Sequence, residues 1–189
     1  MVGASLRRRP TLYVGASLLL ALAVALTGCG SKDRQDKGEK EGTWKVQVVS
    51  ASFPGKQTLA DTTELQIKVK NEDTRTLPNL AVTVDGFDRR EENKDIADPS
   101  RPIWVIEKGP DNSTTAYTNT WAVGAVPAGQ TRTLKWKVTA VRPGTYTLRW
   151  RVAASLTGKS KAVLADDGGA AKGEFVAQVS DKARPFNAN

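Results

Sequence analysis

The side chains available for acid–base chemistry are mainly carboxylates, because the chain of 189 residues contains no histidine. Four acids gather in one charged stretch, namely Glu91, Glu92, Asp95 and Asp98. A glycosidase needs two carboxylates that face one sugar at about 5–10 Å. Arginine and lysine are interleaved with these acids, which favours a solvated loop over a catalytic pair. We therefore expect no catalytic residue, and a small envelope hydrolase is the disfavoured reading.

Other reaction and metal chemistries find little support in the residue types. The lack of histidine, together with a single cysteine, excludes Ser–His and Cys–His pairs and His/Cys metal sites. Gly168-Gly169 lacks the surroundings of a phosphate-binding loop. A calcium site built from Asp85, Asp88 or Asp95 stays open, although no EF-hand pattern supports it. We expect no cofactor.

The single cysteine, Cys29, follows a segment with the order of a secretory signal peptide. Three arginines, Arg7 to Arg9, precede an apolar run over residues 13–26, and small residues follow that run. The run is shorter than the about 20 residues that a membrane-spanning helix needs. A sole cysteine at this point indicates a role for its thiol rather than a disulfide.

The four residues Leu26-Thr27-Gly28-Cys29 resemble the lipobox that lipoprotein signal peptidase recognises. The resemblance implies that residues 1–28 are a signal peptide, recognised through Leu26, Thr27 and Gly28. It also implies that Cys29 carries a diacylglyceryl group as the new N-terminus. The expected location is the extracytoplasmic face of the cell membrane, with the membrane as a partner through the lipid. An ordinary signal peptide and an uncleaved anchor are the alternatives.

Cleavage would leave a moderately basic chain with one domain. Without the three leader arginines, 25 basic and 20 acidic residues remain, a formal net charge of +5 rather than +8. Roughly 160 residues suffice for one domain with a real core. The segment 30–42 has no apolar residue and mixes both charges with glycine. We therefore expect residues 29–42 to form a lipidated N-terminus and a flexible tether.

From residue 43 the apolar side chains recur with a period of two, which is typical of strands with one buried face. The clearest runs are Trp44–Val48, Leu65–Val69, Leu80–Val84, Leu134–Val138 and Tyr146–Val152. A further strand is expected at 174–179, and weaker ones at 103–106 and 116–123. Turn signals such as Pro143-Gly144 separate the runs, and no amphipathic helix is evident.

This succession of short strands predicts an all-β, immunoglobulin-like antiparallel β-sandwich over residues 43–181, followed by a tail at 182–189. Tyr146 comes just after the Pro143-Gly144 turn, where such sandwiches place a tyrosine corner. A plain core tyrosine is the alternative. Trp44, Trp136 and Trp150 follow the inward phase and are expected in the core.

Four consecutive segments look like the bacterial CARDB and related immunoglobulin-like modules. They are the strand 65–71 ending in Asn71, the strand 79–84, the segment 126–138 with its Pro-Ala-Gly turn, and 143–148. The resemblance covers about residues 60–155 and implies a fold type. Members of these families are accessory and adhesion-type modules of exported proteins. The segment between Asp85 and Asn119 is longer than a minimal module needs.

Two surfaces are candidates for binding. In the long 85–119 segment, Trp104 and Trp121 are a candidate aromatic platform, with burial in the core as the alternative. The second is a candidate anionic-surface patch formed by the lysines of two strands, Lys68, Lys70, Lys135 and Lys137. In an immunoglobulin-like order these strands are neighbours. A merely solvated face is the alternative for the lysines.

The sequence predicts a non-enzymatic binding or adhesion module displayed by a membrane anchor. Its partner is an unidentified protein, glycan or envelope polymer, and nucleic acid is not expected. The alternative is a structural or assembly accessory of a cell-envelope complex, in which the edge of the sandwich pairs with a partner.

Overall fold

The chain divides after residue 34 into two units, of which the second spans residues 35–189. The computed structural model describes residues 39–87 and 102–182, all within the second unit. The expected signal peptide, Cys29, the acids of segment 88–101 and the tail 183–189 lie outside the described residues. No helix in the described ranges is long and apolar enough to cross a membrane.

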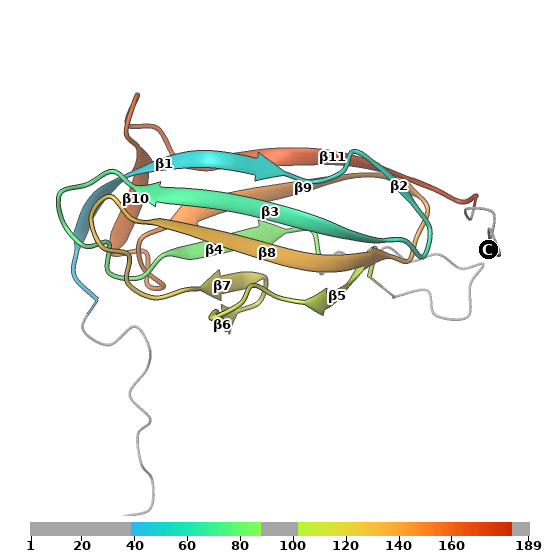
Figure 1. Cartoon of the computed structure of the whole chain (residues 1–189), viewed down its shortest axis with the longest axis horizontal. Helices are drawn as coiled ribbons and strands as arrows, with labels where there is room; N and C mark the ends of the chain where they lie inside the picture. Colours follow the sequence, from blue (N-terminus) through green and yellow to red (C-terminus); the bar gives the residue numbers. More distant parts are fainter. Residues whose placement is uncertain (1–38, 88–101, 183–189) are drawn as a thin grey trace, which may run out of the picture. The chain divides into compact units, whose positions relative to one another are not determined.

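Within residues 39–87 and 102–182, the strands form two sheets. Sheet A has the order β10-β1-β3-β8-β5, with bounds β1 Gly42–Ser52, β3 Thr62–Asn71, β5 Trp104–Lys108, β8 Thr131–Ala140 and β10 Ser160–Leu164. Sheet B has the order β2-β11-β9-β4-β7-β6, with bounds β2 Lys56–Thr58, β4 Ala81–Asp85, β6 Thr114–Tyr117, β7 Thr120–Ala122, β9 Gly144–Ala153 and β11 Lys172–Ser180. Figure 1 shows the two layers, with β1, β3 and β8 in one and β4, β9 and β11 in the other. The predicted all-β, immunoglobulin-like sandwich is confirmed.

Most neighbouring strands are antiparallel, and the two parallel pairs lie at sheet edges. β10 pairs in parallel with the first half of β1, and β2 pairs in parallel with the end of β11. The chain leaves sheet A after β1 and enters sheet B at β2 through residues 53–55. The edge of sheet A formed by β10 and β1 therefore lies on the same side of the sandwich as the edge of sheet B formed by β2 and β11.

The alternation of apolar residues produces the buried inner faces. In β3, Leu65, Ile67 and Val69 are buried between more exposed neighbours. β4 departs from the predicted alternation, since Ala81 and Thr83 are buried as well as the valines. β4 lies between β9 and β7, and the Thr83 hydroxyl forms a hydrogen bond of 2.9 Å with the Thr120 hydroxyl across the strand pair. Its outer face is thus covered where the sequence predicted exposure.

The segment 85–119 contains more regular structure than a long loop. The weak strand expected at 103–106 is β5, and Ile103 and Trp104 are buried side by side at its start. The weak strand expected at 116–123 is instead the hairpin of β6 and β7, which turns at Asn119 with a φ of 57°. Asparagine tolerates this left-handed conformation better than most residues.

Tyr146 forms the predicted tyrosine corner. Its hydroxyl donates a hydrogen bond of 2.7 Å to the Pro143 carbonyl oxygen, and its ring is buried against Trp104. Gly144 has a φ of 141°, and a Cβ atom there would lie 2.7 Å from the tyrosine hydroxyl. The Pro-Gly turn therefore both frees the backbone and leaves room for the hydroxyl.

Candidate functional site

The outer face of sheet A gathers the lysines of β3 and β8. The predicted adjacency of these strands is confirmed, because they pair antiparallel from Thr62 opposite Thr139 to Lys70 opposite Thr131. Their inward positions are buried, so the alternating lysines point to the outer face. Lys68, Lys70, Lys135 and Lys137 consequently share one surface.

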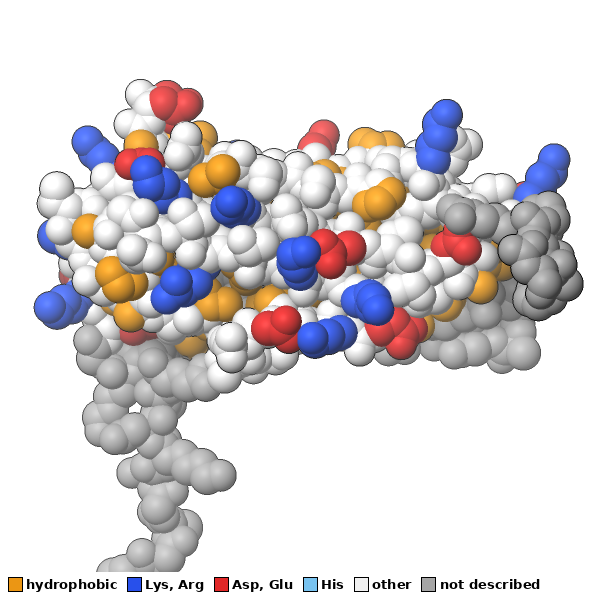
Figure 2. Space-filling view, viewed as in Figure 1, with side chains coloured by type: hydrophobic (Ala, Val, Ile, Leu, Met, Phe, Trp, Pro, Cys, Tyr) orange, Lys and Arg blue, Asp and Glu red, His pale blue; other side chains and the backbone are white. Residues whose placement is uncertain are grey.

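Two further lysines extend this surface. Lys45 lies on β1 next to β3, and Lys161 lies on β10 next to β1; both are exposed on the outer face. We define the lysine face as Lys45, Lys68, Lys70, Lys135, Lys137 and Lys161. Figure 2, in the view of Figure 1, shows basic side chains spread over the visible face with acidic side chains among them.

The register of β3 and β8 keeps like charges apart between these two strands. Lys68 and Lys70 lie opposite threonines, and Lys135 lies opposite Gln66. The expected repulsion between lysines directly across the ladder is therefore absent from this strand pair. The lysines of β3 and β8 are thus staggered, whereas Lys137 lies opposite Lys108 of β5.

Two of the lysines form ion pairs with acids. Lys135 Nζ lies 2.9 Å from Glu64 Oε1, and Lys70 Nζ lies 2.7 Å from Glu72 Oε1. Within the described ranges no ion pair involves Lys68 or Lys137. Exposed pairs of this kind contribute little to stability. The lysine face thus keeps an excess of positive charge that is accessible to solvent.

The candidate aromatic platform requires a correction at Trp104. Its ring is only 1% exposed and packs between Phe53 and Tyr146, with edge-on contacts at centroid distances of 5.7 and 5.5 Å. Its Nε1–H donates a hydrogen bond of 2.8 Å to the buried side-chain oxygen of Gln57. Trp104 is a core residue that satisfies its polar atom internally, as buried tryptophan usually does.

Trp121 is buried too, at 6% exposure, with edge-on contacts to Phe87 and Trp136. One edge of its ring borders a shallow hollow of about 500 Å³ between β5 and the β6–β7 hairpin. Gly109 lies close to the indole nitrogen, because a Cβ atom there would be 3.1 Å from Nε1. Since the whole ring is almost fully buried, its face is not free to stack on a ligand, and the platform of two tryptophans is not formed.

The carboxylates considered for catalysis or calcium lie mostly outside the described residues. Glu91, Glu92, Asp95, Asp98 and also Asp88 belong to the segment 88–101. Asp85, at the end of β4, accepts a hydrogen bond of 2.6 Å from the Arg151 guanidinium. In residues 39–87 and 102–182 no group of three or more acids, cysteines or histidines is placed to hold a metal ion.

The loop after β3 borders the lysine face and is organised by two of its side chains. The Asn71 amide donates to the carbonyl oxygens of Arg75 and Val126, at 2.9 and 2.8 Å. Asp73 Oδ1 accepts from the backbone N–H and from Nε of Arg75, at 3.1 and 3.0 Å. The Arg75 guanidinium lies 4.7 Å from the ring centroid of Trp44 and donates to the Thr43 carbonyl oxygen.

The side-chain hydrogen bond from Arg75 holds the pKa of Asp73 well below its ordinary value, against the smaller opposing effect of burial.

Replacement of Asp73 by Asn is expected to remove a pH-dependent part of the stability. Because the pKa of Asp73 is lower in the folded than in the unfolded chain, the ionised carboxylate stabilises the fold above about pH 4. That contribution is lost as the pH falls toward the folded-state pKa. The difference in unfolding free energy between wild type and Asp73→Asn should therefore shrink from pH 6 to pH 3 in urea titrations.

Asp181→Asn is a suitable control, since Asp181 is exposed just after β11 and has no ion pair in the described ranges. If the difference in unfolding free energy between wild type and Asp73→Asn stayed constant from pH 6 to pH 3, this role for the Asp73 carboxylate would be contradicted.

The end of the segment predicted as a tether is attached to the domain. The Glu39 carboxylate accepts hydrogen bonds from the backbone N–H groups of Leu156 and Thr157, at 2.8 and 3.0 Å, and from the Thr157 hydroxyl at 2.9 Å. The Lys40 carbonyl oxygen accepts a hydrogen bond from the Ser160 hydroxyl, and β1 begins at Gly42. Residues 39–42, expected in the tether, thus contact the loop between β9 and β10. The mixed charge of residues 30–42 predicted a solvated segment, so the role of Glu39 as a hydrogen-bond acceptor for the domain could not be predicted.

Comparisons with known proteins do not assign the chain to a family. The chain matches no protein-family model, and no curated protein matches it. Similar solved structures include the CARDB domain of a Pyrococcus furiosus protein, with 14% identity and a TM-score of 0.40 over 74% of this chain and 93% of that one. A human PapD-like domain has 10% identity and a TM-score of 0.40 over 77% of this chain and 92% of that one. Escherichia coli alpha-2-macroglobulin has 16% identity and a TM-score of 0.42, over 72% of this chain and 9% of that one.

Proposed function

We propose that the protein is a lipid-anchored envelope protein that displays a non-enzymatic binding module. The lipobox-like residues ending in Cys29 support the anchor, and the β-sandwich supports a rigid display module. The absence of histidine and of cysteine from residues 30–189 supports binding rather than catalysis. A CARDB-like sandwich fits this role, because the chemistry of such folds is carried by surfaces and loops.

The observation that carries the proposal is the lysine face. Six lysines from four adjacent strands lie on one side of sheet A, and this arrangement matches phosphate-rich or otherwise anionic groups at the envelope surface. Nine residues separate Cys29 from Glu39. A flexible tether of that length has an r.m.s. reach of roughly 15–18 Å. An anchored domain would therefore keep the lysine face close to anionic headgroups or wall polymer.

Replacing Lys68, Lys70, Lys135 and Lys137 together by Gln is expected to weaken binding to anionic vesicles at least about tenfold. Each lysine near an anionic surface contributes about 1 kcal/mol to the free energy of binding. The acids on the same face reduce the total contribution of the four lysines. The measurement is co-sedimentation with vesicles that contain phosphatidylglycerol. It uses a chain that begins at residue 30, so that no lipid anchor contributes. All core residues lie between Trp44 and Val179, so this chain retains the whole core.

A matched variant separates the lysine face from net charge alone. Lys56, Lys159, Lys172 and Lys182 are exposed and lie outside the lysine face, so their replacement by Gln changes the charge by the same amount. Only the lysine-face variant should lose binding. Equal losses in both variants, or none in either, would argue that these lysines merely keep the sheet solvated. Phosphate-containing wall polymer in place of vesicles tests the second source of anionic groups.

A structural accessory of an envelope complex is the second candidate function. The support for it is the edge of sheet A at β1, which among the described residues has no neighbouring strand for part of its length. A hydrolase is disfavoured, and a measured turnover of envelope polymers by the purified chain would overturn that view.

A further inference from the structure

One side of the sandwich has strand edges that are only partly covered. β10 pairs with Gly42 to Val46 of β1 and then turns away toward β11. The rest of β1, residues 47–52, pairs with β3 on one side only within the described ranges. Figure 1 shows β10 beside one end of β1, with the remainder of that strand at the margin of its sheet. An uncovered stretch of edge strand is a template for another strand.

The backbone groups at the start of this stretch face the uncovered side. The Val46 carbonyl oxygen accepts a hydrogen bond from Ala165 N–H on the β10 side, whereas the Lys45 carbonyl oxygen accepts from Glu72 N–H on the β3 side. Alternate residues of a strand direct their N–H and C=O groups to opposite sides. The polar backbone groups of Val48 consequently point to the side that β10 has left.

This stretch has few of the features with which proteins protect edges. Residues 47–52 read Gln-Val-Val-Ser-Ala-Ser, with no charge and no proline. A bulge between Val48 and Ser50 is the one protective device, and the side chain of Val49 beside it is 44% exposed. The stretch therefore offers both free backbone groups and apolar surface.

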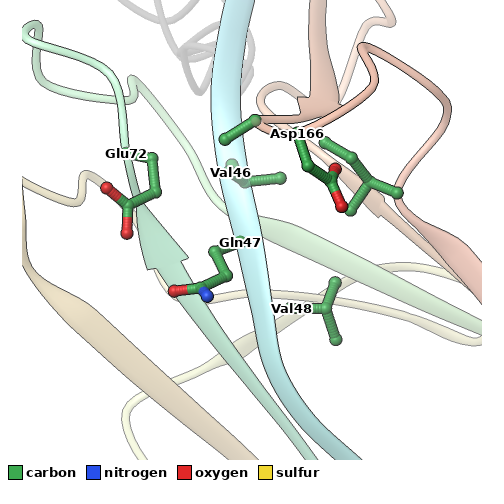
Figure 3. A pocket seen from close by; sticks show the side chains of 7 residues that line it. Val46, Gln47, Val48, Glu72 and Asp166 are labelled. Atoms are coloured by element: carbon green, nitrogen blue, oxygen red, sulfur yellow. The ribbon is translucent and has the colours of Figure 1, made fainter.

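A hollow of about 260 Å³ lies beside the uncovered edge, with Val46, Val48 and Leu164 among its lining residues. Figure 3 shows Glu72 on one side of β1 and Asp166 on the other. Glu72 is paired with Lys70, whereas Asp166 accepts a hydrogen bond from the Asp167 N–H but has no ion pair in the part of the chain that the structure describes. Methyl groups next to a carboxylate without an ion pair match a lysine or arginine, whose aliphatic stem packs and whose charged end pairs.

We infer that residues 47–52 of β1 accept an extended segment of another protein as an added strand, with a lysine or arginine of that segment beside Asp166. Main-chain hydrogen bonds to Val48 and its neighbours give affinity, and the hollow selects the basic side chain. A second copy of this chain is a poorer occupant, because residues 47–52 contain no basic residue to pair with Asp166. The inference deepens the second candidate function, which rests on the same sheet edge. It does not depend on the lysine face, which lies on the outer surface of the same sheet.

The test uses a short blocked peptide of alternating threonine and valine with one central lysine, added to the ¹⁵N-labelled chain from residue 30. Saturable amide shifts confined to residues 42–52 and 164–167 are expected. The same peptide N-methylated at alternate residues should not bind, because it cannot form the ladder hydrogen bonds. Replacing the central lysine by glutamate should weaken binding about two- to fivefold, in line with an exposed ion pair.

Asp166→Asn should remove the preference for the lysine peptide, and the matched variant Asp181→Asn should keep it. Shifts that map elsewhere, an N-methylated peptide that binds equally well, or no shifts at all would each overturn the inference. If the peptide did not bind while vesicle binding was intact, the strand-addition proposal would be wrong and the lysine-face proposal would be unaffected. The two proposals can therefore fail separately.

Discussion

Replacing Trp104 by Ala is expected to lower the free energy of unfolding by about 3–5 kcal/mol, the range for loss of a large aromatic side chain from a core. Three physical losses combine in this change. The ring is almost completely buried, and its edge-on contacts to Phe53 and Tyr146 disappear. The buried Gln57 side chain also loses the indole N–H that donates to it. An acceptor left without a partner in the core adds its own cost.

Chemical denaturation followed by tryptophan fluorescence and circular dichroism measures this effect. Tyr117→Ala is the control, since the Tyr117 side chain is 49% exposed on β6 and its loss should change stability by no more than about 0.5 kcal/mol. If Trp104→Ala left stability unchanged, the ring would not be part of the core, and the discarded aromatic platform would regain its place as a binding surface.

The strands that could be predicted are those in which alternation decides the buried face. β3, β8 and β9 each carry three or more apolar residues at every second position, and all are buried as that pattern requires. The Pro143-Gly144 turn followed by Tyr146 was a second local signal, and it predicted the tyrosine corner. These features depend on neighbouring residues alone, so the sequence contains them directly.

The elements that could not be predicted depend on pairing between distant segments. β2 has only three residues, and β10 reads Ser-Lys-Ala-Val-Leu with a weak period. Each becomes a strand because it lies in parallel beside a strand far away in the chain. The sequence left Trp104 open between a binding platform and the core for a related reason. Ile103 and Trp104 are both buried, so the period of two is broken where the chain enters β5.

The lysine face was predictable in its centre and not at its margin. Lys68, Lys70, Lys135 and Lys137 lie on long alternating strands, whose adjacency follows from the immunoglobulin-like order. Lys161 joins them only because β10 pairs with β1. The two strands are more than a hundred residues apart in the sequence, so no local pattern predicts their pairing. Glu39 was missed similarly, since its role is set by loop backbone groups at Leu156 and Thr157.

Replacing Cys29 by Ser is expected to abolish stable attachment of the protein to the membrane. The thiolate is the nucleophile that would accept the diacylglyceryl group, and a serine hydroxyl is a far weaker nucleophile at neutral pH. Two acyl chains provide stable anchoring because each buried CH₂ contributes about 0.8 kcal/mol, whereas one chain binds only marginally. Without them, the chain should appear in the soluble fraction or accumulate as an unprocessed precursor. Fractionation followed by mass spectrometry of the N-terminus measures both outcomes.

Ser31→Ala is the matched control, because it changes a small polar residue just past the lipobox-like segment and should leave lipidation intact. The alternatives give different patterns. An ordinary signal peptide would yield soluble protein from both variants and from wild type, with no lipid on Cys29. An uncleaved anchor would keep all three in the membrane at the mass of the full chain. Only loss of attachment in Cys29→Ser, with a lipidated N-terminus in wild type and Ser31→Ala, supports display of the sandwich through Cys29. Normal processing and retention of Cys29→Ser would remove the basis for placing the lysine face next to a membrane.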